Sequence, residues 1–263
     1  MIDFLAMLGA GLSAPLAADP APLSPSGKWH VDWNETSCLA LQSYGTDEQR
    51  RVLIIKPSLD GSMVRLILSG PGSRQSAVHL PVDIAGFKAT ALRFTPPKKK
   101  LVVYWIDLPR PEFDRIAALP AVPFKGDRIA LTLSTTGFGA AIKALDSCGV
   151  DLRKHWNADE AGKASISVAA DPTIRIERVA TGNDYPTQAR KEYRGGLTAV
   201  SLLIDDAGAI KDCSIEQSSG VATIDAQTCI LLTERAKFRP ARDASGAAIR
   251  SSKTLRFRWE LGN

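Results

Sequence analysis

The sequence predicts an α+β protein, with a β-rich N-terminal domain closed by a helix and a small second domain of helix, strand, strand, helix and strand. Three observations support this prediction: short apolar runs separated by turn residues up to about Leu133, a helical apolar stripe within residues 135–156, and regularly placed turn residues after Tyr185. The chain has 263 residues, 44% of them hydrophobic and 23% charged, as in ordinary globular proteins. The sequence is therefore long enough for two folded domains.

The first domain is predicted at residues 29–156. Its strands are expected in six runs of β-branched and aromatic residues: RVLIIKP, MVRLILSG, AVHLPVDI, TALRF, LVVYWIDL and RIALTLS. PEFDRIAAL has Pro and acidic residues early and apolar residues at helical spacing, which predicts a short helix. The helix that closes the domain should bury the stripe Ala141, Leu145, Cys148 and Leu152.

The first 28 residues predict an exported chain. Phe4 to Ala18 is an uncharged run, too short for the ~20 apolar residues of a membrane span and typical of a signal peptide. We therefore assign residues 1–18 as a signal peptide and residues 19–28, rich in Pro, Ser and Gly, as a tether. The expected location is the periplasm. The alternatives are a retained apolar helix or an inner-membrane anchor, because no Lys or Arg precedes Phe4.

Four cysteines fit an oxidising compartment, since no Cys-x-x-Cys spacing indicates zinc or redox chemistry. Cys38 lies in the strand-like CLALQSY and Cys148 on the buried helical stripe, so we expect a disulfide between the first strand and the last helix. The alternative is two separately buried thiols. Residues 157–184 are predicted to be a linker with a brief strand at IRIERV.

The net charge of +5 comes from 33 Lys and Arg against 28 Asp and Glu, spread along the chain. The one basic run, Lys98, Lys99 and Lys100, lies between two prolines and an apolar strand and is predicted to be a hairpin tip. A nucleic-acid interface would need a basic stripe with aromatic or motif context, which is missing. Nucleic acid is therefore not expected as a partner.

The local sequence from Tyr185 to residue 263 predicts two helices and three strands. Pro186 begins a helix that continues to Gly195 and Gly196, LTAVSLLI and AIKDCSIEQ form a hairpin around DDAG, and TIDAQTCILLTERAKF is an amphipathic helix. After a turn at DASG, the last strand alternates two sets of side chains. Leu255, Phe257, Trp259 and Leu261 share one face, and Thr254, Arg256 and Arg258 share the other.

The turn and helix residues of this segment resemble, in order and spacing, the C-terminal domain of TonB-family proteins. They are Tyr185, Pro186, Ala189, Gly196, Asp205, Gly208, Ser218, Ser219, Gly220, Asp225, Phe238, Pro240 and Ala241. Each residue alone is weak evidence, but the ordered set over about residues 185–261 is specific. In the same picture Cys213 lies on the inward face of its strand and Cys229 on the helix that packs there, so a disulfide is favoured over free thiols.

The resemblance implies a non-enzymatic binding protein in energy-transducer-like envelope transport. Domains of this family take an extended peptide of an outer-membrane TonB-dependent receptor as an added strand. The equivalent edge here is Ser252, Lys253, Thr254, Leu255, Arg256, Phe257, Arg258 and Trp259, which Arg250 also makes basic. These cations favour an acidic peptide, or they merely keep an edge strand soluble. Because the long proline-rich spacer of the transducers is missing, we expect binding without force transmission.

Alternative functions are a structural envelope protein that binds peptidoglycan, a homodimer through the last strand, or a hydrolase in the first domain. Candidate general bases are His30, His79 and His155, but no His-Glu-x-x-His, Gly-x-Ser-x-Gly or phosphate-loop motif accompanies them. Lone histidines more often have packing or surface roles. No catalytic residue, cofactor or metal site is therefore predicted.

Overall fold

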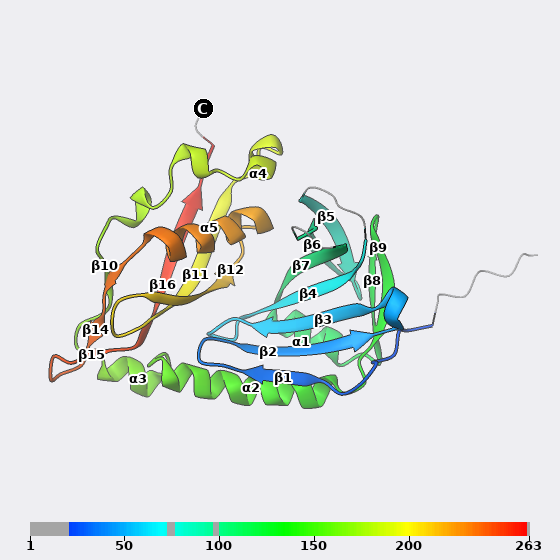
Figure 1. Ribbon diagram of the computed structural model, residues 1–263, viewed down its shortest axis with the longest axis horizontal. Coiled ribbons are helices and arrows are strands. Elements are labelled where there is room, and N and C mark those ends of the chain that lie inside the picture. The colour runs from blue at the N-terminus through cyan, green and yellow to red at the C-terminus, as the bar shows by residue number, and fades with distance from the viewer. Residues whose placement is uncertain (1–20, 73–76, 97–99, 262–263) are drawn as a thin grey trace, which may run out of the picture.

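A computed structural model describes residues 21–72, 77–96 and 100–261. The predicted signal peptide at residues 1–18 and two residues of the predicted lysine tip, Lys98 and Lys99, lie outside this part of the chain. The described residues form an N-terminal region, residues 21–158, and a C-terminal region, residues 159–261, that pack against each other (Figure 1). No helix of the described residues is both long and apolar enough to span a membrane.

The N-terminal region is built on one antiparallel sheet in the order β1-β2-β3-β4-β7-β6-β5-β8-β9. Alternation explains its strands: in β4, for example, Val64, Leu66 and Leu68 are buried and the residues between them are partly exposed. The strands are β1 (His30–Trp33), β2 (Cys38–Tyr44), β3 (Arg51–Pro57), β4 (Met63–Pro71), β5 (Val78–Ile84), β6 (Phe87–Phe94), β7 (Leu101–Pro109), β8 (Ala121–Gly126) and β9 (Ile129–Ser134), with a 3₁₀ turn, η1 (Asp47–Gln49), between β2 and β3.

The curled sheet is closed by the chain segment that precedes it. Leu23 N–H donates to the carbonyl of Thr132 (2.8 Å), and Ser134 N–H donates back to the carbonyl of Leu23 (2.9 Å). Three residues later, Ser26 N–H donates to the carbonyl of Ser43 in β2 (2.8 Å). The segment therefore bridges β9 and β2, and the prediction of a tether at residues 19–28 is wrong over its described part, which is hydrogen-bonded to the sheet.

Two helices accompany this sheet, at the segments where the sequence places them. They are α1 (Arg110–Ala117) and α2 (Phe138–His155). Helix α2 packs against β1 and β2 and buries Ala141, Leu145 and Cys148 of the predicted stripe. The Sγ atoms of Cys148 and Cys38 are bonded, at 1.95 Å, so the bond joins α2 to β2 as predicted.

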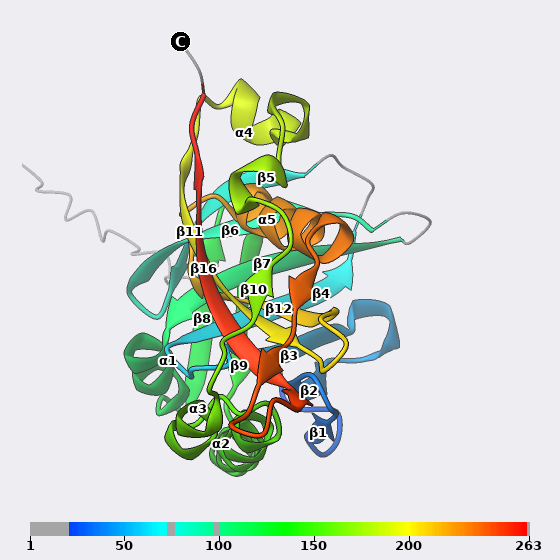
Figure 2. The ribbon, with the colours of Figure 1, turned by 90° about the vertical axis from the view of Figure 1, so that its left-hand side faces the viewer.

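The C-terminal region contains a three-stranded antiparallel sheet in the order β12-β11-β16. Helix α5 covers one face of this sheet (Figures 1 and 2), and the disulfide between Cys213 in β12 and Cys229 in α5, with an S–S distance of 2.05 Å, joins them. The elements are α4 (Thr187–Lys191), β11 (Gly196–Ile204), β12 (Ile210–Gln217), α5 (Ala222–Arg235), β13 (Phe238–Arg239), β14 (Ala241–Arg242), β15 (Ala248–Ile249) and β16 (Ser251–Trp259).

The predicted linker folds onto the C-terminal region. It contains α3 (Glu160–Ser165), β10 (Asp171–Pro172), η2 (Ile176–Arg178) and η3 (Gly182–Asp184). Its Ala170 and Val179 are buried in the core shared by α5 and the three strands. The strand expected at IRIERV is wrong, because this stretch makes a 3₁₀ turn. The helix after Pro186 is also shorter than predicted, since Tyr193 has a left-handed φ of 51°.

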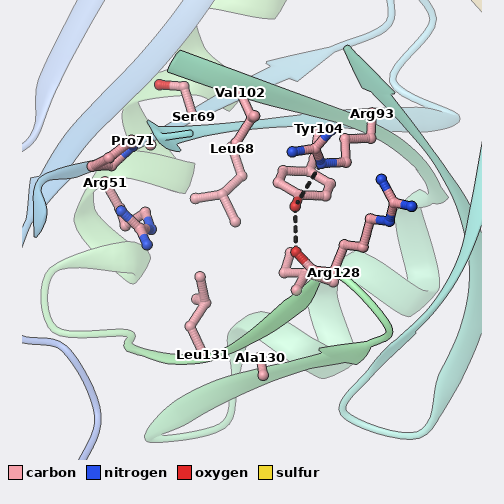
Figure 3. Close-up of a pocket in the computed structure, with 12 residues that line it drawn as sticks. Arg51, Leu68, Ser69, Pro71, Arg93, Val102, Tyr104, Arg128, Ala130 and Leu131 are labelled. Carbon is pink, nitrogen blue, oxygen red and sulfur yellow. Dashed lines mark hydrogen bonds between the residues drawn. The ribbon is translucent and has the colours of Figure 1, made fainter. Parts of the chain in front are cut away.

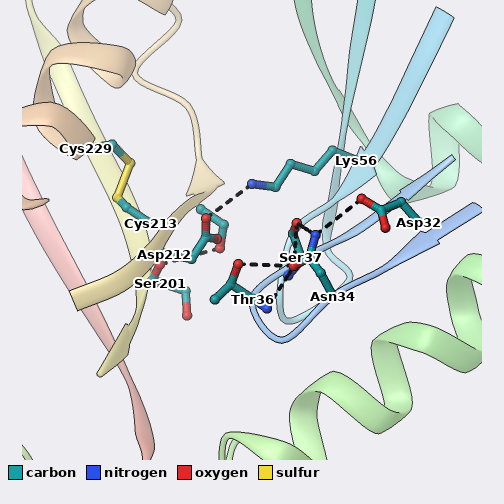
Figure 4. Close-up of polar contacts among 10 residues, drawn as sticks. Asp32, Asn34, Thr36, Ser37, Lys56, Ser201, Asp212, Cys213 and Cys229 are labelled. Carbon is teal, nitrogen blue, oxygen red and sulfur yellow. Dashed lines mark hydrogen bonds and ion pairs between the residues drawn. A yellow bond between two sulfur atoms is a disulfide. The ribbon is translucent and has the colours of Figure 1, made fainter. Parts of the chain in front are cut away.

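The two regions meet through an apolar cluster and polar contacts around it. Leu203 of β11 packs with Leu59 and Trp156 of the N-terminal region, and all three are buried. Beside this cluster, Lys56 Nζ lies 3.5 Å from Asp212 Oδ1 (Figure 4). The outer face of the C-terminal sheet, opposite α5, is therefore partly covered by the N-terminal region.

The Cys38–Cys148 bond generates a stability prediction. Replacing both residues by Ala should lower the free energy of unfolding by about 2–5 kcal/mol, because the bond closes a long loop in the unfolded chain. Denaturant unfolding of the oxidised protein measures the change. Peptide mapping without reductant provides the control for pairing. A double variant as stable as the unmodified oxidised protein would contradict the prediction.

Candidate partner-binding edge strand

Strand β16 lies at one edge of the C-terminal sheet. It pairs with β11 along its whole length, from Gly196↔Trp259 to Ile204↔Ser251. Among the described residues no strand pairs with its other side, which is turned toward the viewer in Figure 2. In a sheet such an edge presents a row of backbone N–H and C=O groups to any extended chain that approaches.

The two faces of β16 differ as its alternating sequence predicts. Phe257 and Trp259 are buried toward α5, and Trp259 Nε1 donates to Thr228 Oγ1 at 2.9 Å. On the opposite face Thr254, Arg256 and Arg258 are exposed. The aromatic side chains thus fix the strand to the core, while the side chains of the other face remain exposed.

Fewer cations are exposed along the β16 edge than the sequence predicts. Lys253 Nζ donates to the carbonyl of Ala170 at 2.7 Å, so it turns toward the folded linker. Arg250 contacts the ring of His155, and its guanidinium lies 5.6 Å from the Trp156 ring centroid. The cations that remain exposed along the edge are Arg256 and Arg258.

A buried carboxylate organises the start of α5. Asp225 is completely buried, and it accepts hydrogen bonds from the hydroxyls of Thr198 (2.8 Å) and Ser218 (2.5 Å) and from the N–H of Ser219 (2.9 Å). These contacts tie the Ser-Ser-Gly turn and β11 to the helix. Because Thr198 lies on β11, which pairs directly with β16, the network supports the edge strand from behind.

Other residues of the predicted motif have roles in close packing. Gly208 has a φ of +82°, and a Cβ there would lie 1.9 Å from the carbonyl oxygen of Phe238. Tyr185 packs edge-on against Trp259 with ring centroids 5.3 Å apart, and its hydroxyl donates to the carbonyl of Arg194 (2.9 Å). These residues therefore shape the domain beneath the edge, and none of them lies on the edge itself.

Residues 181–261 match the family model for the Gram-negative bacterial TonB protein C-terminal. The C-terminal region contains a TonB C-terminal domain. The match starts before the predicted Tyr185 and includes Asp184, which forms an ion pair with Arg235 at the end of α5 (2.7 Å). The match covers less than a third of the chain and so identifies this domain alone. No curated protein sequence matches the chain.

A hollow of about 560 Å³ lies between the N-terminal region and the outer face of the TonB C-terminal domain. It reaches β16 at Ser252 and Thr254, and charged residues of both signs line it. Both carboxyl oxygens of Glu216 in β12 are buried at this place with no hydrogen-bond partner among the described residues. The lining residues are Leu59, Asp60, Arg153, Ala158, Asp159, Glu160, Lys163, Ser201, Glu216, Ser252 and Thr254.

Glu216 and Asp60 form a carboxyl pair across this hollow. Burial and the neighbouring Asp60 raise the pKa of Glu216 to about 8. Although burial opposes the shift, the neighbouring Glu216 carboxyl and the hydrogen bonds from Ser62 and Ser58 lower the pKa of Asp60 to about 2. A protonated Glu216 beside an ionised Asp60 is therefore the arrangement that the site favours below pH 8.

Two of the three histidines contact the C-terminal region: His155 meets Arg250, and a second contact is made by His79. Its Nδ1 lies 3.1 Å from Glu192 Oε2, and its Nε2 accepts from the N–H of Thr223 at the start of α5 (3.3 Å). Burial lowers the pKa of His79, which matches a neutral ring that accepts at Nε2. No group of three or more His, Cys, Asp and Glu in the described ranges could hold a metal ion.

Sequence reasoning missed Leu59, Asp60, Trp156 and Glu216 as contributors to this surface. Nothing in their local patterns distinguishes them, because each acquires its role from a contact between segments far apart in the chain. His79 was visible as a histidine in a strand, but its helix-capping contact could not be read from spacing.

Removing the carboxylate of Asp225 should destabilise the TonB C-terminal domain. Asp225→Ala leaves the buried hydroxyl of Thr198 and the half-buried hydroxyl of Ser218 without their acceptor, and we expect the free energy of unfolding to fall by about 3 kcal/mol. Thermal and denaturant unfolding measure the loss. The matched control is Asp206→Ala at the exposed hairpin turn, with an expected change within about 0.5 kcal/mol. Equal effects of the two variants would contradict the role of the network.

The raised pKa of Glu216 predicts a pH-dependent stability. Between about pH 4.5 and 8 the unfolded chain releases a proton that the folded chain keeps, so the free energy of unfolding falls as pH rises. Glu216→Gln removes this loss and, allowing for partial solvent screening, should be more stable by on the order of 2 kcal/mol at pH 8.

Unfolding midpoints of both proteins from pH 5 to 8.5 test this prediction. The difference between them should grow as pH rises. Glu160→Gln, an exposed glutamate of the same hollow, is the control and should follow the unmodified protein. A constant difference between Glu216→Gln and the unmodified protein across this range would exclude the raised pKa.

Proposed function

We propose that this protein binds an extended peptide segment of an envelope protein as an added strand beside β16. A periplasmic segment of an outer-membrane TonB-dependent receptor is the partner class that fits best. The single observation that carries the proposal is the open outer side of β16 in a TonB C-terminal domain. Main-chain hydrogen bonds would supply affinity, and the side chains on either face of β16 would supply specificity.

The two edge strands of the sheet, β12 and β16, differ in how accessible they are to a partner strand. This difference favours β16 as the binding edge. The opposite edge, β12, contacts β4 of the N-terminal region, and its Asp212 is paired with Lys56 across the boundary. The start of α5, which packs on β12, contacts His79. A partner strand beside β12 would have to displace these contacts. A strand beside β16 would displace no other strand of the described residues.

The exposed side chains of β16 favour a peptide with acidic residues two positions apart. Arg256 and Arg258 are on the same face of the strand, so they would meet alternate residues of an added strand. A second copy of β16 paired antiparallel would bring these cations close to each other, which is unfavourable. We therefore favour a different, acidic partner over a homodimer.

The proposed setting is the periplasmic side of the envelope, in TonB-like transport. Both cysteine pairs lie at bonding distance, and such bonds persist in oxidising compartments. We also propose that the chain acts by binding and not by catalysis, because His79 is engaged in a contact between the two regions. Recovery of the protein from the cytoplasmic fraction of lysed cells would contradict the proposed location.

Strand addition predicts a localised loss of amide exchange. An acidic peptide from the periplasmic segment of a candidate receptor should protect backbone amides within Ser251–Trp259, because they would become hydrogen-bonded. Arg256→Glu should weaken binding about three- to tenfold, and added salt should reduce the difference. Hydrogen–deuterium exchange and calorimetric titration give the two readouts.

Lys211→Glu supplies the matched control for charge. Lys211 is exposed on β12, so this variant has the same charge change on the other edge of the same sheet. We expect its affinity to remain close to that of the unmodified protein. Protection of Ile210–Gln217 in place of Ser251–Trp259, or equal weakening by both variants, would refute binding at β16.

A further inference from the structure

The curled N-terminal sheet has an inner and an outer face, and the outer face meets the TonB C-terminal domain. The inner face encloses the core and, among β3, β4, β7 and β9, a cavity of about 160 Å³ with three arginines in its lining (Figure 3). In β5, Leu80 and Val82 pack toward this core. Because side chains alternate along a strand, His79 lies on the outer face. Opposite it in β6 is Leu92, which carries no charge.

His79 contacts two separate segments of the TonB C-terminal domain. Its Nδ1 lies 3.1 Å from Glu192 Oε2 at the end of α4, and its Nε2 lies 3.3 Å from the backbone nitrogen of Thr223 in the first turn of α5. The side chain of His79 is only 3% exposed. Since the N–H of Thr223 donates, Nε2 accepts, and the ring proton is on Nδ1, where it donates to Glu192. Both contacts are therefore made by the neutral ring.

A second proton on this ring would disrupt its contact with α5. It would place an N–H on Nε2 against the N–H of Thr223, so that two donors would face each other. Burial has the largest effect on the pKa of His79 and lowers it, as the nearby Arg194 does. Glu192 and Asp225 raise this pKa by less. The ring therefore resists protonation as long as the two regions remain in contact.

The boundary between the two regions is held at two places along β11. Near the start of this strand, Thr198 is bonded to Asp225 in the same helical turn that contacts His79 (2.8 Å). Near its end, Leu203 packs in the apolar cluster with the N-terminal region. Figure 1 shows β5 close to α5 at one end of the boundary and α2 at the other end. Proton binding acts on the first place, whereas the second depends on apolar contact.

We propose that His79 is a proton-sensitive latch between the N-terminal region and the TonB C-terminal domain. The neutral ring holds the N-terminal region against α4 and α5. Protonation in acid opens this end of the boundary, while the apolar cluster of Leu203 acts as the hinge. Opening would expose β12, which contacts β4 in the closed arrangement. The latch does not depend on strand addition at β16.

The direction of the pH effect follows from the two states of His79. In the open form the ring is in water and has its ordinary pKa of about 6.5. In the closed form the pKa is lower, so the open form binds the proton more tightly. The closed form is therefore fully stable above about pH 6.5 and loses stability as pH falls below that value.

Backbone amide exchange at pH 7.5 and 5.5, corrected for the intrinsic effect of pH on exchange, tests the latch. Thr223 reports its hydrogen bond to His79, and Ile210–Gln217 reports the exposure of β12. His79→Gln keeps a donor and an acceptor in the side chain but does not titrate. On acidification both reporters should lose at least about threefold more protection in the unmodified protein than in His79→Gln.

Glu216 changes stability in the opposite direction over this pH range, but it is present in both proteins and cancels in their comparison. Glu216→Gln provides a second test that leaves His79 intact. Because its own carboxyl no longer titrates, both reporters should lose protection directly as the pH falls from 7.5 to 5.5.

His30→Gln is the matched control, since His30 is exposed on β1. It should respond to pH as the unmodified protein does. Equal responses of the unmodified protein and His79→Gln would overturn the proposal. A loss of protection confined to Thr223 would overturn it as well, because a single hydrogen bond would then break without any opening of the boundary.

Discussion

The apolar contact of Leu203 with Leu59 and Trp156 fixes the position of the C-terminal sheet relative to the N-terminal region. It lies on the outer face of the central strand β11 and holds the C-terminal sheet against the N-terminal region. Because β11 is paired on both sides, fixing it also fixes β12 and β16. One edge of the sheet then faces the N-terminal region, and the other remains open to solvent.

The open edge is supported by covalent and polar links behind it. The Cys213–Cys229 bond joins β12 to α5, and the Asp225 network joins the start of α5 to β11. Trp259 is packed against Tyr185 and bonded to Thr228. An edge whose geometry is set before a partner arrives loses little conformational entropy on binding, so more of the main-chain hydrogen-bond energy appears as affinity. The same contacts therefore stabilise the core and hold β16 in the geometry that strand addition would need.

Charged groups are buried at three separate places, with different consequences. Asp225 has three donors and acts as a structural centre. Glu216 is enclosed at the boundary of the two regions, where its neighbour Asp60 favours the protonated form. Arg93 is enclosed at the end of the N-terminal sheet, with two further arginines nearby. Burial of charge is unfavourable unless a partner compensates it. The neighbours of Asp225 therefore indicate a structural role, and the neighbour of Glu216 indicates a stability that depends on pH.

The sequence alone determined the local features of this protein. Alternation of apolar and polar residues located the strands, the stripe through Cys148 located α2, and the ordered motif from Tyr185 to Ala241 located the TonB C-terminal domain. These features depend on neighbours a few residues apart, so periodicity and turn chemistry report them directly. Where local preference was weak, as at IRIERV and in the predicted tether, the prediction failed because packing against distant strands decided the conformation.

Only the tertiary structure decided which surfaces are open and which charges are enclosed. Arg250 and Lys253 read as edge cations in the sequence, yet their side chains turn toward Trp156 and the folded linker. Arg51 and Arg93 are 42 residues apart, and their meeting across one cavity follows from the curl of the sheet. Contacts of this kind join segments with no common local pattern. Burial, charge environment and edge accessibility are properties of the whole packed chain, and for that physical reason a linear pattern does not contain them.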